Sequence, residues 1–395
     1  MTALKTPLIA VFPCFCAGLI MGLLFPSEFY LAPTIAVGAF ALWASYKSKG
    51  FVTDLLILLL CVLIGAQRMS ANFQNMEDKT NSTSFIEEKF NSISERLESR
   101  LHAAGLRGDE MSLTSALVLG NRDGLNPELK TKFRQVGASH LLALSGMHLG
   151  VIYGLLCVIC IRWVRFSPFR WIALPLLICG LWTYTLLTGM PASLIRASSM
   201  LSLVCLGILL FRSPPLLHTL TLSATLMLFA NPSLLTDIGF QLSFLAVLFI
   251  ALAYSPFHSL FHSWPILARW PARMLLLSLS AQIGTLPLSA YYFHTLPLSG
   301  PIISLILIPI TTALIYGGLF TVILPIPLFA SFTSLCVQAE LWVLDFWMNL
   351  FPHSLWDNLH PSPLSVMLIY IAMLAGFTRL YKMSSDIKKT HQSVE

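Results

Sequence analysis

Charged residues are scarce in this chain. Only 11% of its 395 residues are Asp, Glu, Lys or Arg, whereas 56% are hydrophobic. Soluble domains carry about 25% charged residues, so the composition excludes an ordinary soluble globular protein. Lipid offers the backbone no hydrogen-bond partner, so only helices or closed barrels cross it. The apolar runs are long and continuous rather than alternating, which predicts an all-α, polytopic transmembrane helical bundle.

Nucleotide-binding and disulfide motifs are also missing. No segment has the GxxxxGK[ST] pattern of a P-loop, so any energy for transport must come from another source. The eight cysteines lie in apolar runs and show no disulfide framework. Cys157 and Cys160 form a C-x-x-C pair inside a predicted span, which favours packing over redox or metal chemistry.

Candidate catalytic and metal-binding residues are few. His140 and His148 lack a third ligand nearby, and their separation is not a usual pair spacing for zinc. Ser145, one helical turn from His148, resembles a nucleophile beside its base. Nothing in the sequence marks the orienting residue or the oxyanion hole that a serine hydrolase needs. We therefore expect no metal, no cofactor and no enzymatic activity.

What the chain has in abundance is apolar runs near the ~20 residues that cross a ~30 Å hydrocarbon core. They lie at 8–24, 33–46, 51–66, 140–161, 171–189, 193–211, 216–231, 238–254, 273–293, 299–324, 327–350 and 364–381. The run 327–350 contains two acids, Glu340 and Asp345, which are costly in hydrocarbon. It either crosses the membrane or lies along the outer surface. We therefore predict about 11–12 spans, with the first retained rather than cleaved as a signal peptide.

Basic residues mark the orientation of the spans. Lys and Arg fall in alternate short loops, at Lys47, Lys49, Arg162, Arg165, Arg170, Arg212, Arg269 and Arg273, and in the tail from Arg379 onward. The intervening short loops contain neither residue. Cytoplasmic loops are enriched in Lys and Arg, so both termini are predicted to be cytoplasmic. The net charge of +6 is therefore mostly a topology signal.

The chain divides into four predicted segments. Residues 1–66 form an N-terminal three-span bundle, 67–139 an outer linker with amphipathic helices, 140–325 a core membrane domain, and 326–395 C-terminal helices with a short tail. Residues 71–84 are a linker by composition. The apolar positions Ile86, Phe90, Ile93, Leu97 and Leu101 follow helical spacing. That helix either lies on the outer leaflet or rests on the protein's own surface.

The stretch before the fourth span has strong local signals. Asn121 to Gly124 form a turn. Asn126 is a ready N-cap with Pro127 at the first helical position, and Gly137 suits the end of that short helix.

The fourth span then begins with the polar residues His140, Ser145 and His148. On a continuous helix all three could face the bundle interior. Gly146 permits close helix approach or a local break, and Gly150 and Gly154 extend the small-residue face. The alternative is that these polar groups only hydrogen-bond neighbouring helices.

Four ordered motifs resemble one family. LGNRDGLNPELKTKFRQVGASHLLALSGMHLG resembles the opening of the membrane domain of the ComEC family of DNA-uptake competence proteins. GMPASLIRASSM, NPSLLTDIGFQLSFLAVL and SLSAQIGTLPLSAYYFH, the last followed by PLSGPIISLILIPI, resemble its later motifs in the expected order. The resemblance covers roughly residues 110–325. It implies an inner-membrane channel that passes single-stranded DNA into the cytoplasm during natural transformation.

Many members of that family carry two further domains. One is an outer oligonucleotide-binding-like domain, for which the helical 67–110 region is too short. The other is a metallo-β-lactamase-like domain after the last span, for which the tail leaves no room. The resemblance therefore implies a reduced channel core, with a separate DNA receptor, nuclease and cytoplasmic motor as expected partners beside DNA and membrane lipids.

Eight residues are predicted to line one polar path through the bundle: His140, Ser145, His148, Arg196, Asp237, Gln241, Gln282 and Thr285. A polyanion crossing lipid needs such groups, because an unscreened charge in a dry core is very costly. Arg196 either contacts phosphate, extends to the outer interface or pairs with Asp237. For each of the eight, interhelical hydrogen bonding is the alternative. Pro287, Pro297, Pro301 and Pro309 are predicted to break the helices around them.

A second function stays open from the sequence. It is a channel-like transporter or envelope-assembly protein for another polar or lipid-linked polymer. DNA affinity separates the two, because only the channel for DNA needs salt-sensitive binding to single strands. The resemblance places the chain in the bacterial inner membrane and leaves its oligomeric state open.

Overall fold

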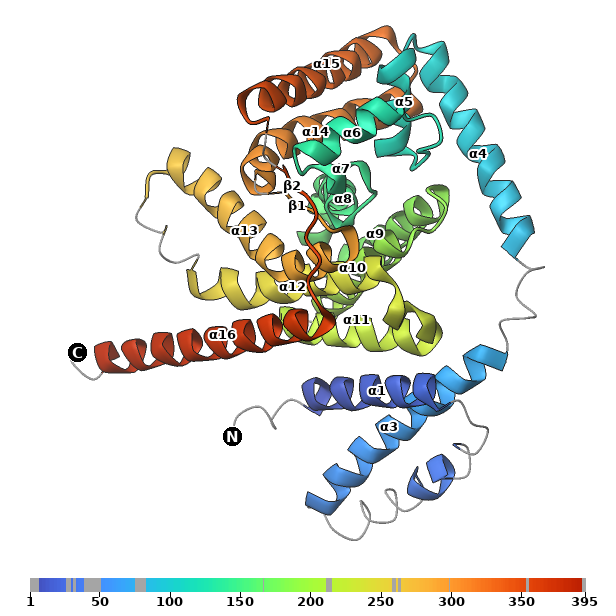
Figure 1. Ribbon diagram of the computed structural model, residues 1–395. Coiled ribbons are helices and arrows are strands. Elements are labelled where there is room, and N and C mark those ends of the chain that lie inside the picture. The colour runs from blue at the N-terminus through green and yellow to red at the C-terminus, as the bar shows by residue number, and fades with distance from the viewer. Residues whose placement is uncertain are drawn as a thin grey trace. The chain divides into compact units, whose positions relative to one another are not determined.

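The computed structural model describes residues 7–25, 30, 33–38, 51–74, 83–165, 167–210, 215–257, 261, 264–297, 299–352 and 355–392. These residues are almost entirely helical (Figure 1). The helices of the N-terminal half are α1 (Pro7–Leu24), α3 (Phe51–Gln74), α4 (Thr83–Ala103), α5 (Gly108–Val118), α6 (Pro127–Gln135), α7 (Ser139–Leu142), α8 (Gly146–Arg165), α9 (Ser167–Leu187) and α10 (Ala192–Leu209).

The second half continues in the same way. Its elements are α11 (Leu216–Ala230), the 3₁₀ helix η4 (Pro232–Thr236), α12 (Ile238–Phe257), α13 (Ile266–Phe293), α14 (Gly300–Ile323), α15 (Pro327–Leu350) and α16 (Pro363–Gln392). Two short strands, β1 (Leu296–Pro297) and β2 (Leu355–Trp356), form an antiparallel pair. The predicted all-α class is confirmed.

Five described helices are long and apolar enough to cross a membrane: α9, α10, α13, α14 and α15. Six others contain shorter apolar segments. The protein is therefore a polytopic membrane protein, and the total of 11–12 spans stays a prediction. Most of the predicted span 33–46 and most of the linker 71–84 lie outside the described residues.

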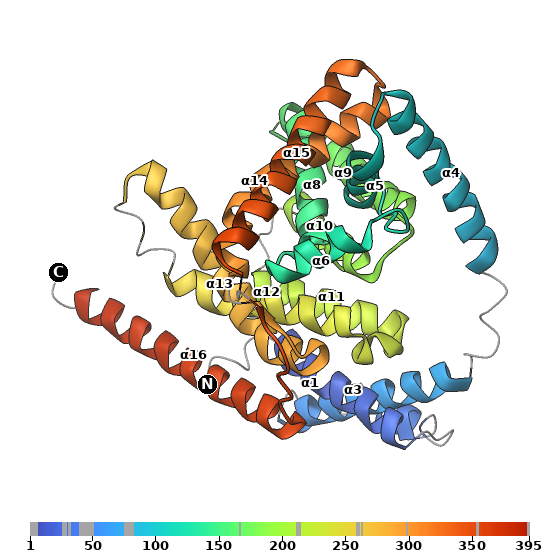
Figure 2. The same cartoon turned by 45° about the horizontal axis from the view of Figure 1, so that its top comes forward.

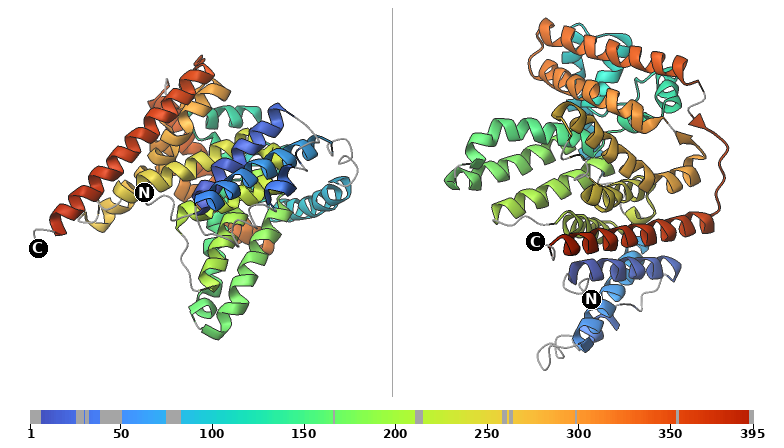
Figure 3. Two further views of the ribbon diagram at one scale, coloured as in Figure 1. Left: turned by 90° about the horizontal axis from the view of Figure 1, so that it is seen from below. Right: turned by 90° about the vertical axis from the view of Figure 1, so that its left-hand side faces the viewer.

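The helices form two compact units. The first contains the described residues of 1–89, 161–179 and 195–241, and the second those of 90–160, 180–194 and 242–395. In the first unit α1 crosses α3 closely (Figure 3). Arg68 of α3 donates from Nε and Nη2 to the carbonyl oxygen of Phe229, at 3.0 and 2.7 Å. The guanidinium thereby caps the C-terminal end of α11.

The second unit is built on the pair α14 and α15, which lie side by side with α5 and α6 against them (Figures 1 and 2). Their shared core includes the fully buried side chains of Leu117, Phe133, Leu307, Leu314 and Val337. The C-terminal part of α4 joins a second cluster, because Leu101 is fully buried beside Leu106 and Val118. That part of the predicted amphipathic helix rests on the protein's own surface.

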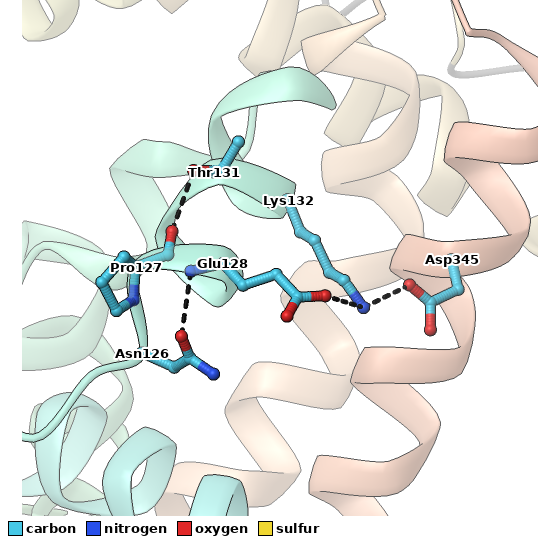
Figure 4. A network of polar contacts seen from close by, with 6 residues as sticks. All are labelled: Asn126, Pro127, Glu128, Thr131, Lys132 and Asp345. Atoms are coloured by element: carbon cyan, nitrogen blue, oxygen red, sulfur yellow. Dashed lines mark hydrogen bonds and ion pairs between the residues drawn. The ribbon is translucent and has the colours of Figure 1, made fainter.

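Helix α6 begins and ends as the sequence predicts. Asn126 Oδ1 accepts from the amide of Glu128 at 3.1 Å, with Pro127 at the first position (Figure 4). At the other end Gly137 takes a φ of +80°. The amide of Ala138 donates to Phe133 O at 2.8 Å, which closes the helix in the glycine-ended motif.

The N-cap at Asn126 contributes to the stability of the folded chain. Asn126→Ala is expected to lower the free energy of unfolding by about 1 kcal/mol, because the Glu128 amide loses its acceptor. Thr131→Ala is the control, since that hydroxyl bonds only Pro127 O within the same helix at 2.8 Å. Thermal unfolding in detergent micelles measures both. Equal effects of the two substitutions would contradict the assignment.

One ion pair joins α6 to α15. Lys132 Nζ lies 2.9 Å from Asp345 Oδ1 and 3.8 Å from Glu128 Oε1 (Figure 4). The hydrogen bond with Asp345 raises the pKa of Lys132 above its ordinary value of 10.5. The stabilisation by this pair is therefore fully present below pH 10.5 and is lost as the pH rises through the higher folded-state pKa.

Asp345→Asn tests this linkage. The variant is expected to be less stable than the native chain by roughly 0.2–1 kcal/mol at neutral pH, as for other partly exposed pairs. The difference should shrink once the pH exceeds the raised pKa of Lys132. Unfolding at a series of pH values measures it, with Glu128→Gln as the control for the longer contact. A difference independent of pH would show that Lys132 is not the partner.

Candidate functional site

The fourth predicted span is broken where its polar residues lie. Helix α7 ends at Leu142, α8 begins at Gly146, and Ala143 has an extended backbone with a φ of −82° and a ψ of 127°. Of the two alternatives that the sequence left open, a continuous helix from residue 140 and a local break at Gly146, the structure shows the break. The physical reason is Ser145, whose Oγ accepts from the amide of Met147 at 3.2 Å and so caps α8 as an N-cap serine does.

His148 packs against this cap. Its Nδ1 lies 3.1 Å from Ser145 Oγ, and the side chain is fully buried. Its Nε2 has no hydrogen-bond partner among the described residues. Ser193, at the start of α10, donates to the carbonyl oxygen of Leu144 at 2.5 Å. The interrupted backbone is thus held by side chains, as buried backbone groups require.

The connection between α13 and α14 packs against the α6–α7 turn and α7, which lead into the break before α8. Gln282 Nε2 donates to Pro297 O at 2.7 Å, and Ser299 Oγ donates to Val136 O at 3.1 Å. His140 Nε2 lies 3.5 Å from Ser304 Oγ. We name residues 136–148 together with 297 and 299–304 the junction. It contains His140 beside Ser304 near the start of α14 and Ser145 beside His148 at the start of α8, and Gln282 contacts it at Pro297.

The junction is packed tightly at Gly137. A Cβ added there would lie 2.5 Å from Pro297 Cβ and 3.2 Å from Gly300 Cα. Gly120 packs closely against the break between α7 and α8, because a Cβ added at Gly120 would lie 2.6 Å from Leu144 Cδ1. Gly120 has a φ of +83°. Conformation favours glycine at both positions, and at Gly137 the close Pro297 ring and Gly300 backbone leave no space for a Cβ as well.

Thr285, the fifth predicted residue of the second unit, bonds within its own helix. Its Oγ1 donates to Ala281 O at 3.0 Å. The neighbouring Gly284 packs on Phe249 of α12, and its carbonyl oxygen accepts from Tyr370 Oη of α16 at 2.9 Å. This part of α13 is thus a contact point for two further helices.

The remaining three predicted residues lie in the first unit. The Arg196 side chain is only 4% exposed, so it does not extend to the protein surface, and the Asp237 carboxylate attracts it. Asp237 Oδ1 also accepts from the amide of Phe240 at 2.6 Å and caps α12. Gln241 Nε2 donates to Leu235 O at 2.8 Å. A single path shared by all eight residues stays a prediction.

The expectation that Pro287 and Pro309 break their helices was wrong. Pro287 and Pro309 lie inside α13 and α14, which continue past them. Among the described residues nothing lies within 4 Å of a Cβ added at Gly150, and at Gly154 only Tyr316 Oη does, at 3.7 Å. The closest helix approaches instead use other glycines, such as Gly18.

Sequence reasoning missed two carboxylates, Glu98 and Glu110, that hold α4 and α5 to their neighbours. Glu98 Oε1 accepts from Asn121 Nδ2 at 2.8 Å and also from Ser115 Oγ. It lines a pocket of about 430 Å³ with His102 and Arg107. Glu110 Oε1 accepts from Ser334 Oγ at 2.5 Å and from Gln338 Nε2 at 3.0 Å. No local spacing pairs these residues, since their partners lie up to 228 positions away.

Comparison with known proteins identifies the family. A sequence model described as "Competence protein" matches residues 117–383, which include the junction and all eight predicted residues. The chain belongs to the ComEC family of competence proteins. Residues 117–383 of this family member thus contain α6 to α15 and most of α16.

Three relatives show how much of the family the chain shares. It is 29% identical to "ComE operon protein 3" of Bacillus subtilis over 285 residues, which cover 70% of this chain and 35% of that protein. It is 30% identical to "Recombination protein 2" of Haemophilus influenzae over 56% of this chain and 28% of that protein. An uncharacterized protein of Aquifex aeolicus is 30% identical over 78% and 69%, respectively.

The chain thus spans about a third of the length of the two named relatives. No solved structure matches it.

Proposed function

We propose that this chain forms the channel through which single-stranded DNA crosses the bacterial inner membrane during natural transformation. The observation that carries the proposal is the junction. Within the matched region of a competence-family membrane protein, the α13–α14 connection packs against the segment that leads into the break before α8, and polar side chains lie there in an otherwise apolar bundle. Irregular backbone among membrane helices is tolerated where it is buried in protein or lines a water-filled cavity, and the proposal assigns the junction to the second case.

The chemistry of the junction suits a polyanion. The helices α8 and α14 both begin there, and helix starts favour negative charge. His140 is exposed and supplies a hydrogen-bonding ring beside Ser304. Contacts of this kind bind phosphate without regard to base sequence, as a channel for any DNA requires.

His148 has a positioning role in this proposal. It is fully buried and bonded to Ser145, so it holds the start of α8 while other groups face the strand. Ser145 and His148 have the separation of a nucleophile and its base. However, no described carboxylate orients the ring through Nε2, as hydrolases of this type require. We therefore assign the chain a transport role without catalysis.

The setting follows from the same proposal. The chain lies in the inner membrane with both termini in the cytoplasm, as the alternate basic loops favour. Lipids surround it. A DNA receptor, a nuclease and a cytoplasmic motor are its expected partners, since a strand must be delivered, separated from its complement and pulled.

Binding of single strands tests the proposal. The purified chain in lipid nanodiscs is titrated with a labelled single-stranded oligonucleotide at several salt concentrations. We expect the logarithm of the association constant to fall linearly with the logarithm of the salt concentration, with a slope of about −0.7 for each phosphate contacted. Gln282→Leu should weaken it, because Pro297 of the junction loses its bond to Gln282, whereas Thr131→Ala, at an exposed position of α6, should not. Absence of salt-sensitive binding in the native chain would overturn the proposal and favour transport of another polymer.

A further inference from the structure

A buried acid lies outside the junction and has no part in the proposed path. Glu340 of α15 is fully buried. Thr311 of α14 donates to its Oε1 at 2.9 Å. Its other oxygen, Oε2, is buried and has no hydrogen-bond partner among the described residues. Glu340 lies near the middle of a helix that is long and apolar enough to cross the membrane.

The surroundings of Glu340 are apolar. On its own helix it lies between Val337 and Leu344, and Thr311 lies between Leu307 and Leu314 on α14. These four side chains belong to the buried core of the second unit. Glu340 is thus a carboxyl group in the interior of the α14–α15 pair, with a single hydroxyl as its described donor.

Neighbouring ionisable groups are engaged elsewhere. On α5, Glu110 bonds Ser334 and Gln338. On α6, Lys132 pairs with Asp345, and no ion pair to Glu340 occurs within 4 Å among the described residues. Four other charged groups on the packed helices lie near the surface: Asp109, Glu128, Lys130 and Arg134. Tyr316 of α14 donates to Val151 O. The Cys336 thiol lies one helical turn from Glu340 on the same helix.

The costs of burying the ionised and the protonated carboxyl group decide which of the two this site accommodates. An ionised carboxylate without a counter-charge in a low-dielectric interior costs many kcal/mol, whereas a neutral acid with one unmade hydrogen bond costs about 1–3 kcal/mol. A hard divalent cation would require about six oxygen ligands, and this site offers one carboxylate and one hydroxyl among the described residues. A proton, by contrast, needs only the one carboxylate that this site offers.

We propose that Glu340, supported by Thr311, is a proton-binding site of the channel, loaded and unloaded during transport. The carboxylate takes one proton from the aqueous phase and becomes a carboxylic acid; release reverses the step. This inference rests on the proposed function for its role in transport, but the site itself does not. Ionisable residues inside transmembrane bundles commonly serve as proton relays.

Infrared spectroscopy in nanodiscs tests the site directly. At neutral pH the native chain should show the carbonyl stretch of a protonated, buried carboxylic acid, shifted in D₂O. Glu340→Gln, which keeps the acceptor for Thr311, should lose this band, and Glu110→Gln should retain it. Thr311→Val should keep the band but move it to higher frequency, since the hydrogen bond is gone. If the native spectrum lacks a band that Glu340→Gln removes, Glu340 is ionised and the proposal is overturned.

DNA uptake by cells tests the role in transport. Glu340→Gln should abolish uptake while single-strand binding by the purified protein is kept, because the fixed neutral amide cannot exchange a proton. Full uptake by Glu340→Gln would show a purely structural acid and overturn the proposal. If the native chain supports no uptake but the band is present, the transport function fails and the proton site stands.

Discussion

Replacing Gly137 by alanine is expected to disrupt the junction and abolish single-strand binding. The added Cβ would lie 2.5 Å from Pro297 Cβ and 3.2 Å from Gly300 Cα, well inside ordinary contact distance. The φ of +80° also disfavours any residue with a Cβ, by roughly 1–2 kcal/mol. Relief requires the α6–α7 turn to move away from the start of α14, which separates Ser299 from Val136 and His140 from Ser304.

The matched control for this substitution is Gly189→Ala. Gly189 has a similar φ of +77°, but nothing described lies within 4 Å of its added Cβ. It therefore carries the conformational cost without the steric clash. We expect Gly189→Ala to bind single strands almost as the native chain does, and Gly137→Ala to lose binding. Equal losses would show that backbone conformation, rather than the contact with α14, is what the junction requires.

Replacing Gly18 by alanine is expected to separate α1 from α3. The added Cβ would lie 1.9 Å from the carbonyl oxygen of Val62, which is backbone and cannot rotate away. Gly22 and Gly65 face similar contacts, at 2.4 Å from Ala66 O and Phe15 O. Close backbone approach of this kind is what small residues provide in membrane helix pairs.

The effect of Gly18→Ala is measured as thermal stability in detergent. Overpacking of a fitted interior costs about 1–3 kcal/mol, and a contact with rigid backbone belongs at the upper end or beyond. Gly150→Ala is the control, because it is also a helical glycine and its added Cβ meets nothing described within 4 Å. If Gly18→Ala were as stable as Gly150→Ala, the described crossing of α1 and α3 would be incorrect.

Local rules predicted much of the fold from the sequence. The apolar runs located α1, α9 to α12, α14 and α15 within four residues of their observed bounds, because length and hydropathy alone decide whether a segment can cross lipid. Helices α3 and α16 continue past the predicted ends at 66 and 381, and α13 begins before the predicted start at 273. The cap at Asn126 and the stop at Gly137 were also predictable, since each depends on one residue and its immediate neighbours.

Contacts distant in sequence were not predictable. The break before α8 depends on Ser145 as an N-cap and on Ser193, which donates to the carbonyl oxygen of Leu144, 49 positions earlier in the chain. The contact of Gln282 with Pro297 O depends on how the α13–α14 connection folds back. The contacts of glycines were not predictable for the same reason: Gly18 and Gly150 look alike in sequence, and only the neighbouring helix distinguishes them. The buried Glu340 was visible as a costly acid, but its partner Thr311 was not.

Uptake of labelled DNA into a nuclease-protected cytoplasmic pool is the most direct test of the channel. A deletion strain is restored with the native chain, with His148→Ala, or with His102→Ala, which alters an exposed histidine of α4. At equal membrane abundance we predict that the native chain and His102→Ala restore uptake and that His148→Ala does not, because the start of α8 loses its buried support. Unchanged uptake in the deletion strain of a competent host would contradict the assignment of this chain as the DNA channel.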